Sequence, residues 1–156
     1  MRIEQDDVSR AEVRDLLRIH HENSALHSPP ESTHVLDISE LQAPSVTFWT
    51  LWDDTNLVGC GALKELATDH GEIKSMHTLG HYRGRGAGAM ILTHIIETAR
   101  LRHYTCLSLE TGAMDAYAPA RALYRKFGFK DCAPFANYQL DPYSQFMNLQ
   151  LSPLQR

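Results

Sequence analysis

Residues 1–44 carry a short extended pattern followed by helical spacing and turns. Residues 1–5 predict a strand, and Ser9 with Glu12 forms a capping box that predicts the start of a helix. Apolar side chains and one histidine then recur at helical intervals as far as about His21: Val13, Leu16, Leu17 and His20. Pro29 and Pro30 predict a loop, and Val35, Ile38 and Leu41 predict a second, short helix.

From residue 45 the pattern changes to that of antiparallel strands. Residues 46–52 are rich in β-branched and aromatic side chains, and residues 57–66 and 72–79 form two further strand-like runs. Turn-forming residues separate the three runs. The pattern therefore predicts an antiparallel meander of three strands, in which Trp49 and Trp52 face opposite sides of the sheet.

The second half of the chain alternates helices with strands. Apolar residues form one stripe along a helix predicted over residues 86–102: Ile91, Leu92, Ile95, Ile96 and Ala99. A strand is predicted over 104–110, a helix over 119–127 that ends before Gly128, and a closing strand over 146–151. The fold class is therefore α/β or α+β, with one mixed sheet covered by helices in a single domain, residues 1–156.

Composition narrows the functional classes. The chain has 156 residues and a net charge of −4, which is typical of one soluble domain and argues against general binding of nucleic acids. No apolar run approaches the roughly 20 residues that span a bilayer, so no membrane partner is predicted. Cys60, Cys106 and Cys132 lack a CxxC spacing, which favours reduced thiols and a cytoplasmic location. The nine histidines form no HExxH motif, so no metal site is predicted.

The most informative segment lies between a predicted strand and a long helix: Arg83, Gly84, Arg85, Gly86, Ala87 and Gly88. Glycine lets backbone amides approach a ligand, and a helix N-terminus offers N–H groups and partial positive charge. With two arginines added, this pattern is typical of a phosphate or pyrophosphate site. The structural alternative is a flexible strand-to-helix turn that contains glycine and arginine for no functional reason.

The same glycines also satisfy the G-x-G-x-x-G/A pattern of nicotinamide-dinucleotide sites, and Glu110 ends the next predicted strand. Three antiparallel strands come first, however, and too little chain follows to build the remaining parallel strands of that fold. A P-loop is excluded because no Gly-Lys-Ser/Thr follows the loop. A dinucleotide oxidoreductase is therefore a distant alternative.

Two motifs in order resemble those of the GNAT superfamily of N-acetyltransferases. Residues 83–88 resemble its R/Q-x-x-G-x-G/A loop, and residues 120–129 resemble its A-x-x-L-Y-x-x-x-G-F helix end. The resemblance covers residues 45–151, which it makes the sheet and acetyl-CoA-binding core, and leaves residues 1–44 as the helical, acceptor-side region. It implies a mixed, mostly antiparallel sheet whose central strands splay apart, with acetyl-CoA bound in the gap and no metal.

The resemblance also implies roles for single residues. The backbone of Met76, His77 and Thr78 would pair with the pantetheine arm of acetyl-CoA, and the amides of residues 83–88 would hold its pyrophosphate. Tyr124 matches the tyrosine that commonly lies near the CoA sulfur, where it could protonate the departing thiolate; core packing is the alternative.

Two more cofactor neighbours are implied on the second motif. Ala120 opens the motif itself. Tyr117 stands where many family members carry an asparagine that contacts the pantetheine. A phenol can hydrogen-bond there or stack instead, so the function of Tyr117 is left open.

An acceptor amine must lose a proton before it can attack a thioester. The candidate bases are Glu72 and Glu110, ranked equally, with His77 below them. Alternation along the third meander strand predicts that Glu72, Lys74, Met76 and Thr78 share one face. A chain of waters, or carboxylates that are merely solvated or paired with Lys74 or Arg121, are the alternatives.

The function predicted first is direct transfer of an acetyl group from acetyl-CoA to a primary amine of a small molecule or amino acid derivative, in a ternary complex. Acetylation of a protein N-terminus or lysine is one alternative, and a non-catalytic acyl-CoA sensor is another. The predicted partner is a small-molecule amine, and the resemblance also allows a homodimer.

Overall fold

The computed structural model describes residues 1–27 and 37–152, so the loop predicted at Pro29 and Pro30 and the residue Val35 lie outside the described residues. The helices are α1 (Ala11–His27), α2 (Ile38–Leu41), α3 (Ala87–Leu101) and α4 (Ala118–Lys126), with short 3-10 turns η2 (Gly80–Tyr82) and η3 (Asp115–Tyr117). The strands are β1 (Arg2–Gln5), β2 (Val46–Asp53), β3 (Asn56–Ala67), β4 (His70–Thr78), β5 (Cys106–Gly112), β6 (Lys130–Asp131) and β7 (Ser144–Gln150).

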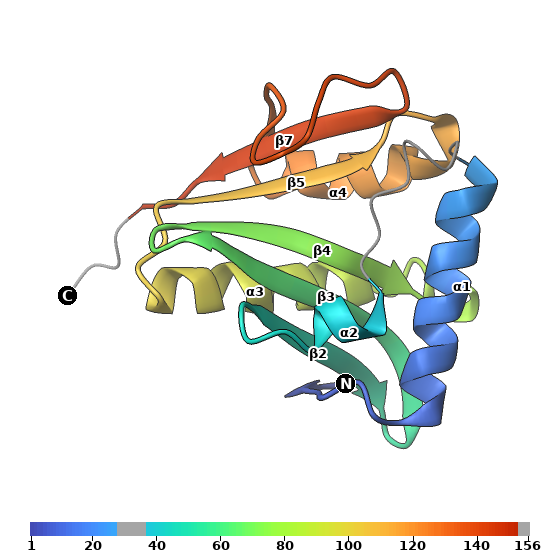
Figure 1. Ribbon diagram of the computed structural model, residues 1–156. Helices are drawn as coiled ribbons and strands as arrows, with labels where there is room; N and C mark the ends of the chain where they lie inside the picture. Colours follow the sequence, from blue (N-terminus) through green and yellow to red (C-terminus); the bar gives the residue numbers. More distant parts are fainter. Residues whose placement is uncertain (28–36, 153–156) are drawn as a thin grey trace.

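One seven-stranded sheet runs through the molecule in the order β1-β2-β3-β4-β5-β7-β6. Every neighbouring pair is antiparallel except β4 and β5, which are parallel. That parallel pairing covers only four residues of each strand and ends at Ile73 opposite Leu109. Beyond it the two strands diverge toward α1 (Figure 1). The mixed, mostly antiparallel sheet with splayed central strands is confirmed. The Rossmann alternative is wrong because the described residues form a single parallel strand pair.

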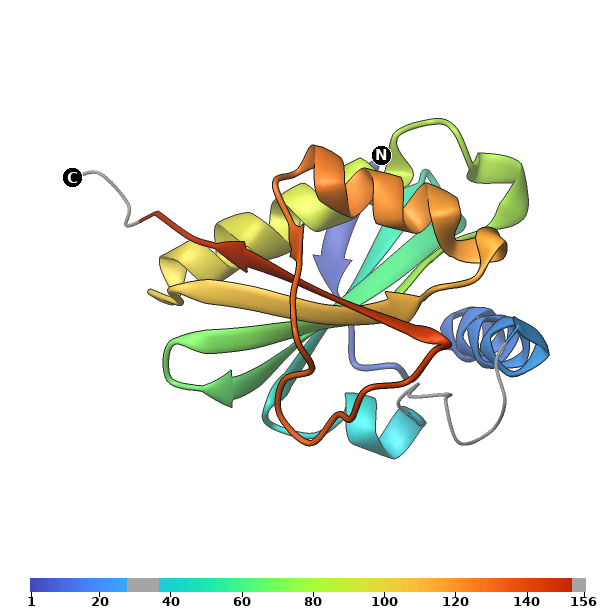
Figure 2. The same cartoon turned by 90° about the horizontal axis from the view of Figure 1, so that it is seen from above.

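Helices cover both faces of this sheet. Figure 2 shows α3 and α4 on one face, and α2 with the loop that leads into β7 on the other. Trp49 lies in the hydrophobic cluster under α3, whereas Trp52 lies in the cluster beneath α1 and α2. The two tryptophans therefore face opposite sides as predicted, and both are buried.

Helical periodicity located α3 well and α1 less well. All five apolar residues predicted for the α3 stripe are buried. Helix α1 instead continues six residues beyond His21, and it begins at Ala11. The predicted capping box at Ser9 is wrong, because the Ser9 hydroxyl bonds to Asp7 and lies outside the first turn. A capping box does form at α2, between Asp37 and Glu40.

The prediction that Glu72, Lys74, Met76 and Thr78 share one face is wrong beyond Lys74. Ser75 has a positive φ of 57° and the β3–β4 register shifts beside it, so a β-bulge adds one residue to β4. Met76 consequently packs into the core under α3, whereas His77 turns toward α1. A bulge reverses the alternation of every residue that follows it.

Candidate functional site

The divergence of β4 and β5 leaves one backbone edge of each strand without a neighbouring strand among the described residues. On its other side, β4 still pairs with β3, where Thr78 lies opposite Gly59 and His77 opposite Cys60. Met76, His77 and Thr78 therefore present their free edge to the gap. An extended ligand with amide groups can pair with such an edge as an added strand would.

Gly59 on β3 lies directly against the backbone at this end of β4. A Cβ built on Gly59 would lie 2.6 Å from the backbone oxygen of His77 and 3.4 Å from the Thr78 Cα. Replacing Gly59 by alanine is therefore expected to lower the free energy of unfolding by about 1–3 kcal/mol, because backbone must shift. Urea unfolding measures this. Gly80→Ala is the control, since a Cβ there meets no atom within 4 Å; equal losses in both variants would contradict the prediction.

The glycine-rich loop sits at the N-terminus of α3, as predicted. Gly84 and Gly86 adopt positive φ values of 77° and 80°, a region that favours glycine. Gly86 is the N-cap residue of α3. The first helical bond runs from the Met90 N–H to the Gly86 oxygen, so the amides of the preceding turn point outward. Arg83 and Arg85 are exposed beside them. This loop can bind an anion through backbone N–H groups and two guanidinium groups.

Helix α4 packs beside this loop. A Cβ on Gly88 would lie 3.1 Å from the Leu123 side chain, which shows how closely the start of α3 approaches α4. Ala120 is partly buried on α4. Ala87 is buried in the core cluster beneath. The two family-like motifs are therefore brought together in space.

Tyr124 is buried, with 6% of its surface exposed, and its ring meets that of Phe129 edge-on at 5.7 Å. Burial raises the pKa of its phenol well above the usual value, so the hydroxyl keeps its proton. Its ring belongs to the core cluster under α3 and α4. Core packing and proton donation are thus compatible in one side chain.

Tyr117 lies against the end of β5. Three of its ring atoms lie between 2.1 and 2.6 Å from the position of a Cβ on Gly112, so the ring occupies the space that a side chain there would fill. Tyr117 therefore stacks on the backbone at the mouth of the gap. Only glycine at position 112 permits this stacking.

Glu72 is buried in a polar cluster rather than exposed to the gap. Its Oε2 accepts a hydrogen bond from the Tyr138 hydroxyl at 2.6 Å and lies 3.1 Å from Nζ of Lys74. Lys74 in turn donates to the Tyr138 hydroxyl oxygen at 2.7 Å. One carboxylate oxygen is thus held by two donors. We call Glu72, Lys74 and Tyr138 the phenol cluster.

Glu110 lies one residue beyond the last β4–β5 pair and is partly exposed. It shares the face of Ser108, which bonds to His70 and Asn148 on the side away from α3. Burial, the Glu72 carboxylate and, to the smallest extent, the Glu110 carboxylate raise the pKa of the Tyr138 phenol. The structure therefore brings both candidate carboxylates to one side of the gap.

His77 pairs with His20, which helical spacing places on the stripe of the first helix. Its Nδ1 lies 3.1 Å from Nδ1 of His20 on α1, and the two rings meet edge-on. One ring donates and the other accepts, so at least one Nδ1 carries a hydrogen. This contact ties α1 to the end of β4 that borders the gap. No local pattern could reveal it, because 57 residues separate the partners.

The histidine pair predicts a pH dependence of stability. Burial, with smaller effects of His77 and His21, lowers the pKa of His20 from 6.5 to about 4; burial and Arg83 lower that of His77 to about 4. The folded protein thus holds His20 neutral where the unfolded chain would bind a proton. The contribution of neutral His20 to the free energy of unfolding is therefore present above pH 6.5. It is lost progressively as the pH drops toward 4.

For His20 we expect a loss of about 1–2 kcal/mol in the free energy of unfolding between pH 7 and pH 5. A His20→Gln variant should lose correspondingly less over the same interval. Urea unfolding at the two pH values measures both. Equal losses in wild type and variant would contradict the neutral pair.

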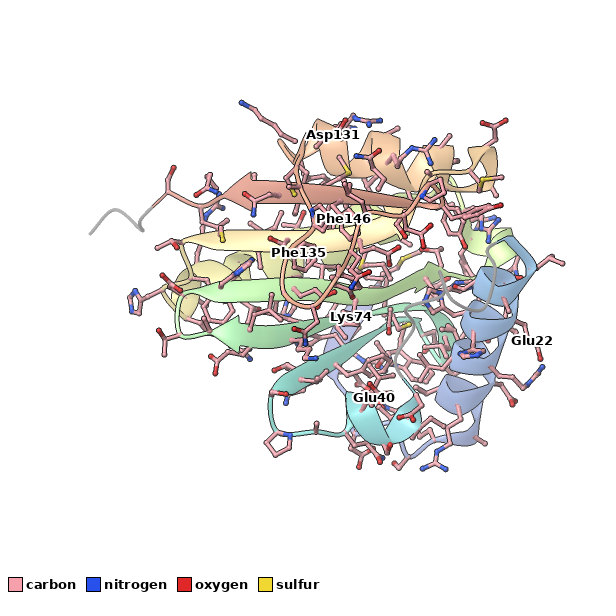
Figure 3. The ribbon with its side chains drawn as sticks, turned by 45° about the horizontal axis from the view of Figure 1, so that its top comes forward. Glu22, Glu40, Lys74, Asp131, Phe135 and Phe146 are labelled. Carbon is pink, nitrogen blue, oxygen red and sulfur yellow. The ribbon has the colours of Figure 1, made fainter. Side chains whose placement is uncertain are left out.

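A pocket of about 950 Å³ opens on the same face as the phenol cluster. It lies between strands β3 and β4 and the segment 136–141 of the loop before β7, with α2 at its far edge. Figure 3 shows Lys74 on β4 below Phe135 and Phe146, and Glu40 on α2. Its lining mixes polar and apolar surface about equally: Glu40, Lys64, Glu65, Leu66, Ala67, His70, Glu72, Lys74, Ala136, Asn137, Tyr138, Gln139, Leu140 and Asp141.

The described residues show neither a cluster of metal ligands nor a membrane-spanning helix. Within residues 1–27 and 37–152, no three His, Cys, Asp or Glu side chains converge as metal ligands would. In the same part of the chain, no helix combines the length and apolarity needed to cross a bilayer.

The sequence resembles known proteins along most of its length. Residues 11–129 match the model of the acetyltransferase (GNAT) family. The chain belongs to this family. The uncharacterized N-acetyltransferase YsnE of Bacillus subtilis is 49% identical over 97% of this chain and 100% of its own length. The uncharacterized N-acetyltransferase YedL of Escherichia coli is 46% identical, over 96% and 94%. An IAA acetyltransferase of Azospirillum brasilense is 39% identical, over 79% and 80%.

Solved GNAT structures share the fold. A protein from Klebsiella pneumoniae described as an acyl-CoA N-acyltransferase has a TM-score of 0.77 and 28% identity, over 97% of both chains. A GNAT acetyltransferase from Elizabethkingia anophelis, solved with acetyl-CoA bound, has a TM-score of 0.72 and 18% identity, over 96% and 97%. Together with the relatives at 46–49% identity, these findings identify the chain as a GNAT-type N-acetyltransferase.

Proposed function

We propose that this GNAT enzyme transfers the acetyl group of acetyl-CoA directly to a primary amine of a small molecule, within a ternary complex. The observation that carries the proposal is the early end of the β4–β5 pairing. It leaves a strand edge open between the glycine-rich loop on one side and the pocket on the other. The two substrates would thus reach the gap from different sides and meet there.

The residues present fit acetyl-CoA, which would supply an activated acetyl thioester. The pyrophosphate would be held by the backbone amides of residues 84–88 and by Arg83 and Arg85. A Cβ built on Gly84 or Gly86 meets no atom within 4 Å, so the loop has open space in front of it. The edge of Met76, His77 and Thr78 would pair with the amides of the pantetheine arm. Tyr117 would line the arm by stacking.

Glu110 is the proposed general base. A base must reach the acceptor amine with an oxygen that is able to take its proton. Glu110 is partly exposed and follows the last strand pair, whereas Glu72 is buried. Glu110 would take the proton directly or through one water. Glu72 then serves to hold Lys74 and Tyr138 in place.

Two further groups would assist the transfer. Backbone N–H groups on the open edge of β4 would stabilise the negative charge that develops on the thioester oxygen. Tyr124 would donate its proton to the departing sulfur, because burial keeps the phenol neutral. The base and the acid are thus a carboxylate on β5 and a phenol on α4.

A small acceptor is favoured by the size of the pocket, about 950 Å³ between the sheet and the 136–141 segment. The IAA acetyltransferase of Azospirillum, 39% identical, carries a name that refers to a small molecule. A protein N-terminus or lysine is the second candidate, although no feature of the described residues favours it.

The test is a panel of primary amines, including small amines, amino acid derivatives and peptides, incubated with acetyl-CoA while free thiol release is followed. We expect thiol release that depends on one class of small amine, with the N-acetyl product found by mass spectrometry. Turnover of peptides alone would contradict the small-acceptor assignment. Thermal protection by acetyl-CoA without turnover of any amine would contradict the catalytic proposal.

A further inference from the structure

Tyr138 closes a ring of three hydrogen bonds inside the pocket. Its hydroxyl donates to Oε2 of Glu72 and accepts from Nζ of Lys74, while Lys74 also donates to the same Glu72 oxygen. The side chains of Lys74 and Glu72 are only 8% and 4% exposed. The ammonium is thus held against its carboxylate and almost fully buried.

The Tyr138 ring is fixed from several sides. It meets Phe135 edge-on at 5.0 Å and Phe146 at 5.6 Å, and the Lys74 ammonium lies 5.5 Å from its centre. These contacts come from the loop itself, from β7 and from β4. The phenol therefore has little freedom to leave Lys74.

The phenol cluster lies where the chemistry is proposed to occur. Ile73 and Leu109 form the last parallel pair, and Lys74 and Glu110 are the next residues on their strands. An acceptor in the pocket would therefore contact the cluster at the end nearest the gap.

The lining of the pocket is acidic. On this face of the sheet, three carboxylates accompany two ammonium groups: Glu40, Glu72 and Asp141 against Lys64 and Lys74. Lys74 and Glu72 neutralise each other within the phenol cluster, so Glu40 and Asp141 remain against Lys64 alone. A pocket of this charge favours a ligand that carries positive charge.

We infer that Tyr138 is a specificity-determining residue: by holding Lys74 against Glu72 it keeps the pocket acidic, and it thereby selects acceptor amines that carry a second positive charge. This inference rests on the proposed function, because the pocket must bind the acceptor. Without the hydroxyl, Lys74 would lose one partner and could extend its ammonium into the pocket. A second cationic group on the acceptor would then be repelled.

The experiment compares 1,4-diaminobutane with butylamine, which differ by one ammonium group. We expect wild type to favour the diamine in kcat/KM at least about tenfold, and Tyr138→Phe to reduce this preference about fivefold to tenfold. The KM for acetyl-CoA should stay within about twofold, because the variant leaves the cofactor side intact. Tyr143→Phe, on the same loop but outside the pocket lining, is the matched control and should keep the preference.

Ionic strength separates charge selection from a merely structural role. Added salt should weaken the diamine preference of wild type and have less effect on Tyr138→Phe, because salt screens charge and not shape. A preference for butylamine in wild type, or an unchanged preference in Tyr138→Phe, would overturn the inference while amine turnover still supports the proposed function. No turnover of any amine by wild type would refute both.

Discussion

Replacing Glu110 by glutamine is expected to lower kcat for amine acetylation at least about 100-fold, the usual scale of general-base catalysis. The amide is nearly the same size as the carboxylate but cannot accept a proton. Glu110 follows the last parallel pair of β4 and β5, on the face that carries the pocket. Steady-state kinetics at saturating acetyl-CoA measures the loss, and the KM for acetyl-CoA should change little.

The matched control is Glu72→Gln, since Glu72 is the other carboxylate at the gap. Its Oε2 is already occupied by Lys74 and Tyr138, so its loss should weaken the phenol cluster and raise the acceptor KM. We expect kcat to fall less than about tenfold. A larger fall in kcat for Glu72→Gln than for Glu110→Gln would assign the base to Glu72.

Tyr124→Phe is expected to lower kcat about 10-fold to 100-fold, with a smaller change in the KM for acetyl-CoA. The substitution removes one oxygen from a buried ring, so the packing against Phe129 is kept. The departing thiolate would then leave without its proton donor. Rates over a range of pH, with saturating acetyl-CoA, measure this.

The raised pKa of the Tyr124 phenol predicts how kcat varies with pH. Because burial keeps the phenol protonated far into the alkaline range, its loss of a proton should not limit wild-type kcat below about pH 10. A kcat for Tyr124→Phe that equals wild type at every pH would remove the acid role. The tyrosine would then be a packing residue only.

Local patterns predicted the elements that build the proposed cofactor side. The α3 stripe from Ile91 to Ala99 is regular because that helix buries one face along its whole length. The glycines of the loop were readable for a different reason: Gly84 and Gly86 adopt a backbone conformation that other residues resist. Where one local rule dominates, the sequence is enough to predict the structure.

The acceptor side was harder to predict, because its contacts join distant parts of the chain. Tyr138 reaches Glu72 across 66 residues, and His20 reaches His77 across 57. The loop before β7 is rich in aromatic residues, but that composition does not show which strand the loop contacts. The bulge at Ser75 likewise depends on pairing with β3, so simple alternation placed Met76 on the wrong face.

The boundary of α1 shows a third reason for error. Ser9 and Glu12 have the spacing of a capping box, but Asp7 attracts the Ser9 hydroxyl and the helix starts later. A motif of two residues cannot report a competing partner nearby. The GNAT motifs predicted the family correctly, because two long signatures occur in a fixed order.

A single-turnover experiment tests the central claim, direct transfer from acetyl-CoA to an amine. The enzyme is mixed with an equal amount of acetyl-CoA labelled in the acetyl group, an amine that the panel identifies is added, and protein, amine and CoA are analysed over time. Direct transfer predicts that the label passes to the amine with one CoA released per N-acetyl product and that the protein stays unlabelled. Label on the protein before the amine is added, or retained acetyl-CoA with no N-acetyl product, would contradict it.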